Sequence, residues 1–410
     1  MRSRFLVVLP LFLAASLSLA GPHDWPQWQG PDRTAISSEK GLVQEWSKDG
    51  PKMLWKAEGI GESYSTPTVA SGRIFVMGNR ERKECVFALA EKDGEQLWRY
   101  EIGDVRHNGG GYAGPRCSPT VDGDRVYALG LNGDFVCLET SSGKLLWRKD
   151  LVKDFKGAPG GWGYSESPLV DGDKLLCTPG GRTATLVALD KKTGEPLWKG
   201  LVPQGDGAAY SSIIAVTVEG QRQYIQFLSG GVVGLSAEGK FLWRYDHPHN
   251  GTANCSTPIY HDGHVFAASN YGVGGGLAKL TRNGDKWEAK EVYFTRDMKN
   301  HHGGMVLLDG KLYGSNEGEL VCLDFKSGEV QWREREPGKG SITCADGRLY
   351  YRNEGGPMFL VEVNEKKYVR CGRFSPPRSG SPAWPHPVIA NGRLYIQDQD
   401  KLMCYDVKQR

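Results

Sequence analysis

Apolar residues in this chain alternate with polar residues or form short runs of four or five, and Gly, Asp and Asn separate the runs. Residues 118–148 show the full pattern, reading in order SPTV, DG, RVYAL, NG, FVCLE, SG and LLWR. Asp-Gly and Asn-Gly favour type I′ hairpin turns, because both central residues of such a turn need positive φ. The stretch therefore predicts one antiparallel sheet of four short strands, and the lack of a 3.6-residue period predicts almost no helix.

The four-strand pattern recurs along the chain. Tryptophans mark the last strand of successive units at spacings of 44 to 51 residues, namely Trp98, Trp147, Trp198, Trp243, Trp287 and Trp332. The starts of the first strands give a separate count of eight units, at Pro67, Pro119, Pro168, Ser212, Pro258, Met305, Ile342 and Pro387. This period is typical of propeller blades. We expect an all-β, eight-bladed propeller of four-stranded antiparallel sheets; seven blades remain the alternative, since the unit near Ile342 has Tyr368 and Val369 in place of its tryptophan.

Both ends of the chain contribute to the predicted ring. The last unit ends at Asp406 without a fourth strand, whereas residues 53–56, around Trp55, match the fourth strand of the unit described above. We expect this N-terminal strand to close the last blade, because closure leaves no long unpaired edge. The propeller then covers residues 51–410, and residues 21–50 form an extension that packs on it.

Residues 1–20 have the order of a secretory signal, with Arg2 and Arg4, an apolar run and small residues ending at Ala20. No cysteine follows the expected cleavage site, so we expect no lipid anchor and a periplasmic or secreted protein. No later apolar run is long enough to span a membrane. The chain has 51 Lys and Arg against 48 Asp and Glu, without blocks of one sign, so no nucleic-acid partner is expected. Nine cysteines leave at least one unpaired.

Residues 188–198 read ALDKKTGEPLW, with Ala188, Asp190, Gly194 and Trp198 at fixed spacing. This segment resembles the Ala-x-Asp-x-x-x-Gly-x-x-x-Trp motif of pyrroloquinoline-quinone (PQQ) dehydrogenase propellers, and partial copies extend the resemblance over residues 51–410. The resemblance implies that Trp98, Trp147, Trp198, Trp243 and Trp332 dock neighbouring blades. The architecture is also similar to that of the propeller in the outer-membrane β-barrel assembly machinery.

Residues just before each first strand should converge at one mouth of the central channel. Five of these residues are expected to bind a cofactor, namely Glu62, Arg116, Trp162, Tyr210 and Trp384. The resemblance implies that Arg116 and Trp162 contact a quinone, that Glu166 and Asn254 hold a calcium ion, and that Asp297 is the catalytic base. His301, His302 and His386 offer a different metal site, although adjacent residues of a strand point to opposite sides. These groups also suit a polar channel that holds only water.

The departures from the dehydrogenase pattern favour a binding role. The chain lacks an adjacent Cys-Cys pair and a haem-attaching Cys-x-x-Cys-His, and it is shorter than those enzymes. We therefore expect an extracytoplasmic binding or scaffold propeller, with envelope proteins or a small molecule as partner. The alternative is a PQQ- and calcium-dependent oxidoreductase that acts on an alcohol or sugar.

Overall fold

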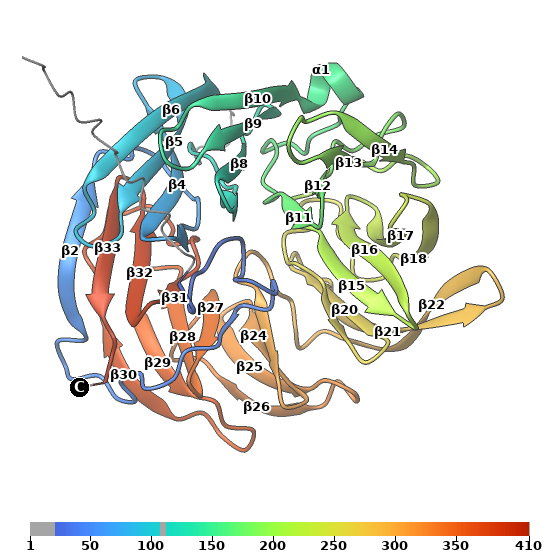
Figure 1. The fold of residues 1–410 in the computed structure, drawn as a ribbon. Coiled ribbons are helices and arrows are strands. Elements are labelled where there is room, and N and C mark those ends of the chain that lie inside the picture. Colours follow the sequence, from blue (N-terminus) through green and yellow to red (C-terminus); the bar gives the residue numbers. More distant parts are fainter. Residues whose placement is uncertain (1–20, 107–111, 410) are drawn as a thin grey trace, which may run out of the picture.

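A computed structural model describes residues 21–106 and 112–409 of the chain; the predicted signal peptide lies outside the described residues. Eight sheets surround a central axis (Figure 1). The predicted eight-bladed, all-β propeller is confirmed. In the part of the chain that the structure describes, α1 (Leu151–Phe155) is the only α-helix.

The first four blades follow the chain in order. Blade 1 contains β3 (Thr68–Ala70), β4 (Arg73–Arg80), β5 (Lys83–Ala90) and β6 (Gln96–Asp104); blade 2 contains β7 (Thr120–Asp122), β8 (Arg125–Leu129), β9 (Asp134–Glu139) and β10 (Leu145–Asp150). Blade 3 contains β11 (Leu169–Asp171), β12 (Lys174–Cys177), β13 (Leu186–Asp190) and β14 (Pro196–Gly200); blade 4 contains β15 (Ile214–Val218), β16 (Gln221–Leu228), β17 (Gly231–Ser236) and β18 (Phe241–Tyr245). All strands within these sheets pair antiparallel.

The other four blades complete the ring. Blade 5 contains β19 (Ile259–His261), β20 (His264–Ser269), β21 (Gly274–Asn283) and β22 (Lys286–Thr295); blade 6 contains β23 (Met305–Leu308), β24 (Lys311–Asn316), β25 (Glu319–Asp324) and β26 (Val330–Glu334). Blade 7 contains β27 (Gly340–Ala345), β28 (Arg348–Asn353), β29 (Met358–Glu362) and β30 (Arg370–Phe374), with β1 (Ile36–Ser37) parallel to β27. Blade 8 contains β31 (Val388–Ala390), β32 (Arg393–Asp398), β33 (Lys401–Asp406) and β2 (Lys52–Glu58).

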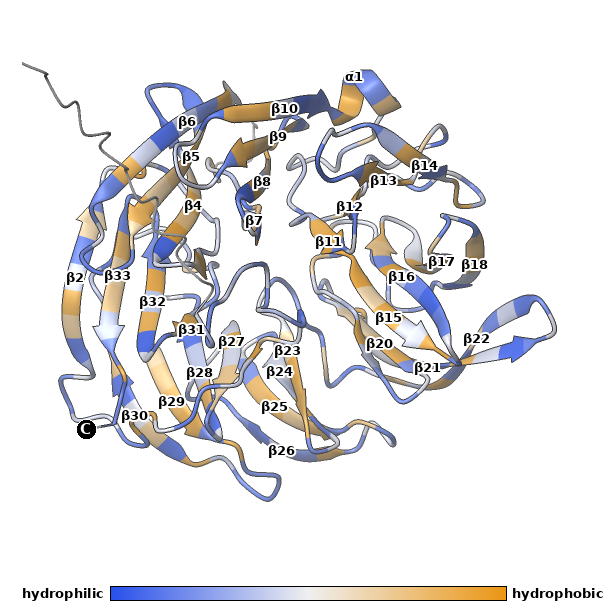
Figure 2. Cartoon of the chain, viewed as in Figure 1, coloured by the Kyte–Doolittle hydropathy of each residue, from blue (hydrophilic) through white to orange (hydrophobic). Residues whose placement is uncertain are grey.

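The ring closes between the two ends of the chain. Strand β2 pairs antiparallel with β33, from Lys52 opposite Asp406 to Glu58 opposite Lys401. Blade 8 therefore takes its outermost strand from the N-terminal part of the chain, and the two sheets on either side of it complete the circle. Apolar residues concentrate in the strands and polar ones in the connections (Figure 2), as expected where sheet faces pack against each other.

Tryptophans and glycines join neighbouring blades in pairs. The indole nitrogen of Trp147 donates to Lys191 O of the next blade at 3.2 Å. Its ring lies so close to Gly194 that an added Cβ would be 2.8 Å from it. Four other tryptophans donate to a backbone carbonyl of the following blade in the same way, namely Trp55, Trp98, Trp198 and Trp332. For Trp55, Trp98, Trp147 and Trp198, a glycine of the following blade lets the ring lie directly against the turn.

Within the full motif, each position has a visible structural task. Asp190 Oδ1 accepts hydrogen bonds from the backbone nitrogens of Lys192 and Thr193 at 2.9 and 2.8 Å, which fixes the turn. Ala188 is fully buried opposite Trp198. Gly194 has a φ of +74°, a conformation that L side chains rarely adopt.

Three blades depart from the tryptophan rule, namely blades 4, 5 and 7. In blade 5, Tyr293 contacts Gly328 of the next blade and donates to Phe325 O at 2.9 Å. Trp287, which the spacing counted as the repeat tryptophan, instead donates to the side chain of Gln221. In blade 4, Trp243 donates to the side chain of Gln223 within its own blade and not to the following blade. The long hairpin of β21 and β22 in blade 5 moves Trp287 away from the docking position.

In blade 7 the docking tryptophan comes from the N-terminal extension. Gly372 occupies the place of a fourth-strand tryptophan, opposite Leu360, and the side chain of Trp46 packs directly against Gly372. Trp46 is 8% exposed and makes edge contacts with Tyr350 and Phe374. It belongs to the apolar cluster between blades 7 and 8.

The N-terminal extension crosses the ring (Figure 1, dark blue). Trp25 pairs with Val69 of blade 1, and the Arg33 guanidinium donates to Ser167 O and Ile213 O at the starts of blades 3 and 4. Ala35 O then accepts from Cys344 N of blade 7. Residues 25–35 thus lie across one end of the channel. Within the described residues, no helix is long and apolar enough to cross a membrane.

Candidate functional site

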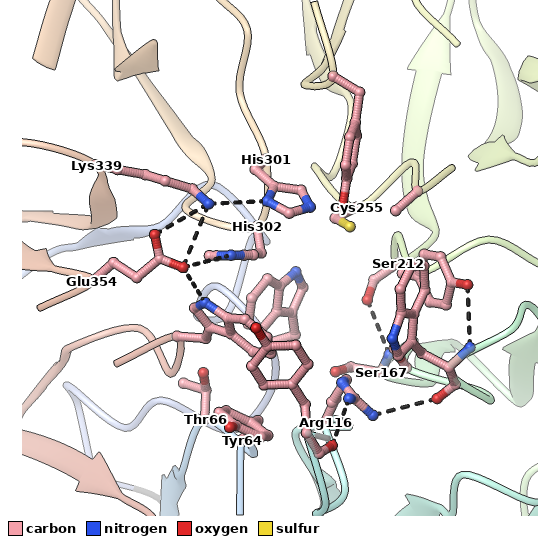
Figure 3. Close-up of a pocket in the computed structure, with 18 residues that line it drawn as sticks. Tyr64, Thr66, Arg116, Ser167, Ser212, Cys255, His301, His302, Lys339 and Glu354 are labelled. Atoms are coloured by element: carbon pink, nitrogen blue, oxygen red, sulfur yellow. Dashed lines mark hydrogen bonds and ion pairs between the residues drawn. The ribbon is translucent and has the colours of Figure 1, made fainter. Parts of the chain in front are cut away.

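A cavity of about 280 Å³ lies where the segments before the first strands meet. We call it the mouth cavity. Aromatic side chains from several blades form much of its wall, namely Trp28, Tyr64, Tyr112, Trp162, Tyr210, Tyr271 and Trp384. Arg116, His301, His302, Lys339 and Glu354 supply its charged and titratable groups. Figure 3 shows Lys339, Glu354 and the two histidines on one side, with Arg116, Ser167 and Ser212 on the other.

The N-terminal extension contributes Trp28 to this cavity. Its indole nitrogen donates to Thr257 Oγ1 at 2.9 Å, and its ring lies 4.5 Å from the ring of His386. His386 is buried and its Nε2 lies 2.9 Å from His302 O. Burial lowers the pKa of His386 to about 4, so this ring is neutral at pH 7. The extension therefore lines the cavity and does not merely coat the outside of the ring.

One wall of the mouth cavity holds a compensated ion pair. Lys339 Nζ lies 3.1 Å from Glu354 Oε2, and the Trp384 indole nitrogen donates to Glu354 Oε1 at 2.6 Å. His302 Nε2 lies 3.6 Å from the same oxygen. Burial alone would raise the pKa of Glu354, but these partners outweigh burial and hold that pKa well below its usual range. Glu354 is therefore ionised and fully engaged.

The histidines beside this pair are neutral. Burial, together with the neighbouring His302 and Lys339, lowers the pKa of His301 to about 3. Burial also lowers the pKa of His302. Lys339 Nζ lies 3.2 Å from His301 Nδ1, a distance at which the ammonium donates to a neutral ring nitrogen. This wall carries no net charge.

The opposite wall holds a cation, Arg116. Its guanidinium donates to the backbone oxygens of Tyr112 and Trp162 at 2.9 and 3.3 Å and lies 5.7 Å from the centre of the Tyr64 ring. Among the described residues, no carboxylate pairs with it. Burial lowers the pKa of Arg116, and Glu84 is the carboxyl among the main groups that raise it. Burial raises the pKa of Glu84 to about 8, so Glu84 is largely neutral at pH 7.

The expected quinone-binding residues divide into two groups. Arg116, Trp162, Tyr210 and Trp384 all line the mouth cavity. Glu62 does not line it; this residue is exposed and accepts from the Asn79 side chain at 3.2 Å. The structure thus brings four of the five together.

The expected calcium ligands face away from the mouth cavity. Glu166 is 3% exposed, and its two oxygens accept from Thr178 N at 2.8 Å and Gln226 Nε2 at 3.0 Å. Burial raises its pKa to about 7. The residues on either side, Ser165 and Ser167, do line the cavity. Successive residues of an extended chain point to opposite sides, which is why Glu166 lies behind this wall.

Asn254 has the same arrangement two blades further on, just before β19 of blade 5. Its Oδ1 accepts from Asn250 N at 2.9 Å and its Nδ2 donates to Leu228 O at 3.0 Å, while its neighbours Ala253 and Cys255 line the cavity. Asp297 lies outside the cavity and pairs with Arg333 at 3.1 Å. No group of three or more His, Cys, Asp or Glu within residues 21–106 and 112–409 is arranged to hold a metal. These donors do not fit a calcium site at the mouth.

The sequence matches the family described as outer membrane protein assembly factor BamB over residues 18–109 and 82–334, which is most of the chain. The chain belongs to the BamB family. BamB from Kangiella koreensis is 27% identical over 213 residues, which cover 51% of this chain and 49% of that protein. The chain spans about half the length of the first curated relatives it matches.

Solved structures share the fold of this BamB-family chain. The quinohemoprotein alcohol dehydrogenase from Comamonas testosteroni has a TM-score of 0.63 at 12% identity and covers 94% of this chain and 80% of its own. BamB from Moraxella catarrhalis has a TM-score of 0.59 at 14% identity, with coverages of 87% and 99%. At such low identity these likenesses show the fold alone. The predicted resemblance to PQQ-like propellers is confirmed.

Sequence reasoning missed several residues of the site in this BamB-family propeller. Lys339 directly precedes β27 and met the same positional criterion as the predicted residues, so it could have been found. Glu354 lies in the turn after β28, and Trp28 arrives from the extension, so no repeat position indicates either. Residues outside the repeat complete the charge balance and the aromatic wall.

Proposed function

We propose that this BamB-family chain is an extracytoplasmic binding and scaffold protein that works with other cell-envelope proteins. The family match over most of the chain supports this role, since its relatives are named as outer-membrane protein assembly factors. The observation that carries the proposal is the mouth cavity, in which aromatic rings and a cation face inward while Glu166 and Asn254 are engaged within their blades. Such a cavity can bind a ligand without a metal ion.

The proposal includes a location. The signal-like residues 1–20 support release into the periplasm or beyond the cell. Protein partners would then meet the propeller on its faces or rim.

The test of the scaffold role uses purified components. The mature chain is mixed with the outer-membrane assembly proteins of the same organism, and the mass of the mixture is followed by size-exclusion chromatography with light scattering. A stable complex of defined stoichiometry is expected. A mixture that elutes as separate components at micromolar concentrations contradicts the scaffold role.

The runner-up is a PQQ- and calcium-dependent oxidoreductase acting on an alcohol or sugar. Arg116, Trp162, Tyr210 and Trp384 around one cavity favour it, whereas the engaged Glu166 counts against it. A ligand that binds only the native state must raise stability. We expect no calcium-dependent rise in the Tm at saturating PQQ. A rise that Arg116→Gln removes and Arg125→Gln, outside the cavity on the same blade, retains would support the oxidoreductase instead.

A further inference from the structure

We propose that the mouth cavity binds a small aromatic monocarboxylate, whose carboxylate pairs with Arg116 and whose ring lies between the aromatic walls. This inference rests on the proposed binding role of the chain and names the ligand class for it. Three observations carry it: an uncompensated cation, a neutral opposite wall and a ring-lined space of suitable size.

The charge of the cavity favours a single anionic group. Glu354 and Lys339 compensate each other at 3.1 Å, and burial keeps His301 and His302 neutral. Arg116 has no carboxylate partner among the described residues, so one positive charge remains. Its hydrogen bonds to the backbone oxygens of Tyr112 and Trp162 stabilise this cation but do not neutralise its charge. One carboxylate balances this charge, whereas a phosphate dianion would leave an excess negative charge.

The open edge of Arg116 fits a carboxylate. A guanidinium has five N–H donors. Its Nη1 interacts with Gly114 O and Trp162 O, and its Nη2 donates to Tyr112 O. No hydrogen bond occupies Nε among the described residues. Nε and Nη2 lie on one edge of the guanidinium, and such an edge binds both oxygens of a carboxylate.

Aromatic rings surround the space in front of Arg116. The centres of Tyr64 and Tyr112 lie 4.6 and 4.8 Å from that of Trp384, and Trp162 lies 5.7 Å from Tyr210. Such rings favour a flat aromatic group in offset or edge contact. An apolar cavity of about 150 Å³ holds benzene. The 280 Å³ here accommodate a ring together with its carboxylate.

The hydrogen-bonding groups favour an aromatic acid over a sugar acid. A sugar ring brings several hydroxyl donors that need acceptors. Among the described residues, Glu354 is the only carboxylate that lines the cavity, and it already interacts with Lys339, Trp384 and His302. The hydroxyl oxygens of Thr66, Ser167 and Ser212 already accept from backbone nitrogens, so these groups offer mainly O–H donors to a ligand. An acid with an apolar ring satisfies such donors and the ring faces better than a sugar acid does.

The test is isothermal titration of the mature protein with four probes: indole-3-acetate, its neutral amide, benzoate and glucuronate. Charge-assisted hydrogen bonds are stronger than neutral ones, so we expect indole-3-acetate to bind about tenfold or more tightly than the amide. Arg116→Gln should remove this preference, while Arg125→Gln on the same blade should keep it. The acid-to-amide ratio of the unaltered protein needs no variant and stands if Arg116→Gln does not fold.

Each of the other outcomes contradicts a specific part of the proposal. Equal binding of acid and amide would remove the carboxylate assignment but leave the cavity as a binding site. Tighter binding of glucuronate than of both aromatic acids would remove the ring assignment. Binding of none of the four overturns the inference alone, because complex formation with assembly proteins is measured separately.

Discussion

Gly194 shows how one residue position joins two blades. Its positive φ already disfavours any side chain, and the Trp147 ring fills the space where a Cβ would lie. Gly172 in the same blade has a φ of +61° but no atom within 4 Å of an added Cβ. Substituting each glycine by alanine therefore separates the cost of backbone strain, which both positions share, from the cost of packing, which only Gly194 has.

We expect Gly172→Ala to lower the free energy of unfolding by about 1 kcal/mol, the cost of a left-handed backbone. Gly194→Ala should lower it by a further 1–3 kcal/mol, roughly the cost of overpacking a close contact. Urea unfolding of both variants measures the difference. Equal losses would mean that the Trp147 contact adds nothing.

The buried carboxyl of Glu84 makes stability depend on pH. Its oxygens accept from Leu131 N at 3.0 and 3.3 Å, and burial raises its pKa to about 8, above the usual 4.5. Between these values the folded state holds a proton that the unfolded state has lost. The contribution is thus complete below pH 4.5 and disappears as the pH rises through about 8.

Glu84→Gln keeps an acceptor for Leu131 N and removes the titration. We expect the unaltered protein to lose stability relative to Glu84→Gln between pH 5 and pH 8, by a few kcal/mol at most, roughly 1.4 per unit of pKa difference. Urea unfolding at pH 5, 6.5 and 8 gives the comparison. Parallel pH profiles for the two proteins would show that Glu84 is already ionised in the folded state.

Side-chain direction limited how well the site could be predicted. Arg116, Trp162, Tyr210 and Trp384 were found because they directly precede first strands that converge. Glu166 was assigned to the mouth from the same position, yet its neighbours Ser165 and Ser167 face the cavity. The sequence shows that a segment reaches the channel, but a one-residue change of phase decides which side chain enters it.

At the scale of elements, the turns and first strands were predictable because Gly, Asp and Asn bound each apolar run. The fourth strands were less predictable. Blade 5 uses Tyr293 where the spacing indicated Trp287, because β21 and β22 are ten residues each. Blade 7 takes Trp46 from a distant segment, which no local pattern reveals.

Trp46 should therefore contribute to stability as much as a repeat tryptophan. Trp46→Ala opens the cluster between blades 7 and 8, and we expect a loss of about 3–5 kcal/mol, typical of removing a large buried side chain. Leu54→Ala is the control, since Leu54 is 39% exposed on β2 and should change stability little. Chemical unfolding of both variants measures the two losses of stability. A similar small loss in both would mean that the extension packs loosely.

At the scale of the whole molecule, the ring is held without disulfides. All nine cysteines are free, seven of them buried, although the expected compartment is oxidising. Burial raises the pKa of Cys255, which lines the mouth cavity, to about 12, and this slows its reaction with thiol reagents.

Titration with Ellman's reagent without reductant should find nine thiols after unfolding in guanidinium and a slow, partial reaction before it. The slow phase reflects burial and raised thiol pKa values. A count of seven or fewer after unfolding would reveal disulfide bonds and contradict the free cysteines. Cys371→Ser should lower the count by one without changing stability much, because Cys371 is only partly buried.

The pairing of β2 with β33 also determines how early the ring can close while the chain is being synthesised. Glu58 leaves the ribosome about 340 residues before its partner Lys401. At synthesis rates of about 5–20 residues per second, β2 waits roughly 20 to 70 seconds for β33. Until then the ring stays open and its first strand has no permanent neighbour. The last blade can form only after the final strands have been synthesised, so the closed ring is the last part of the structure to form.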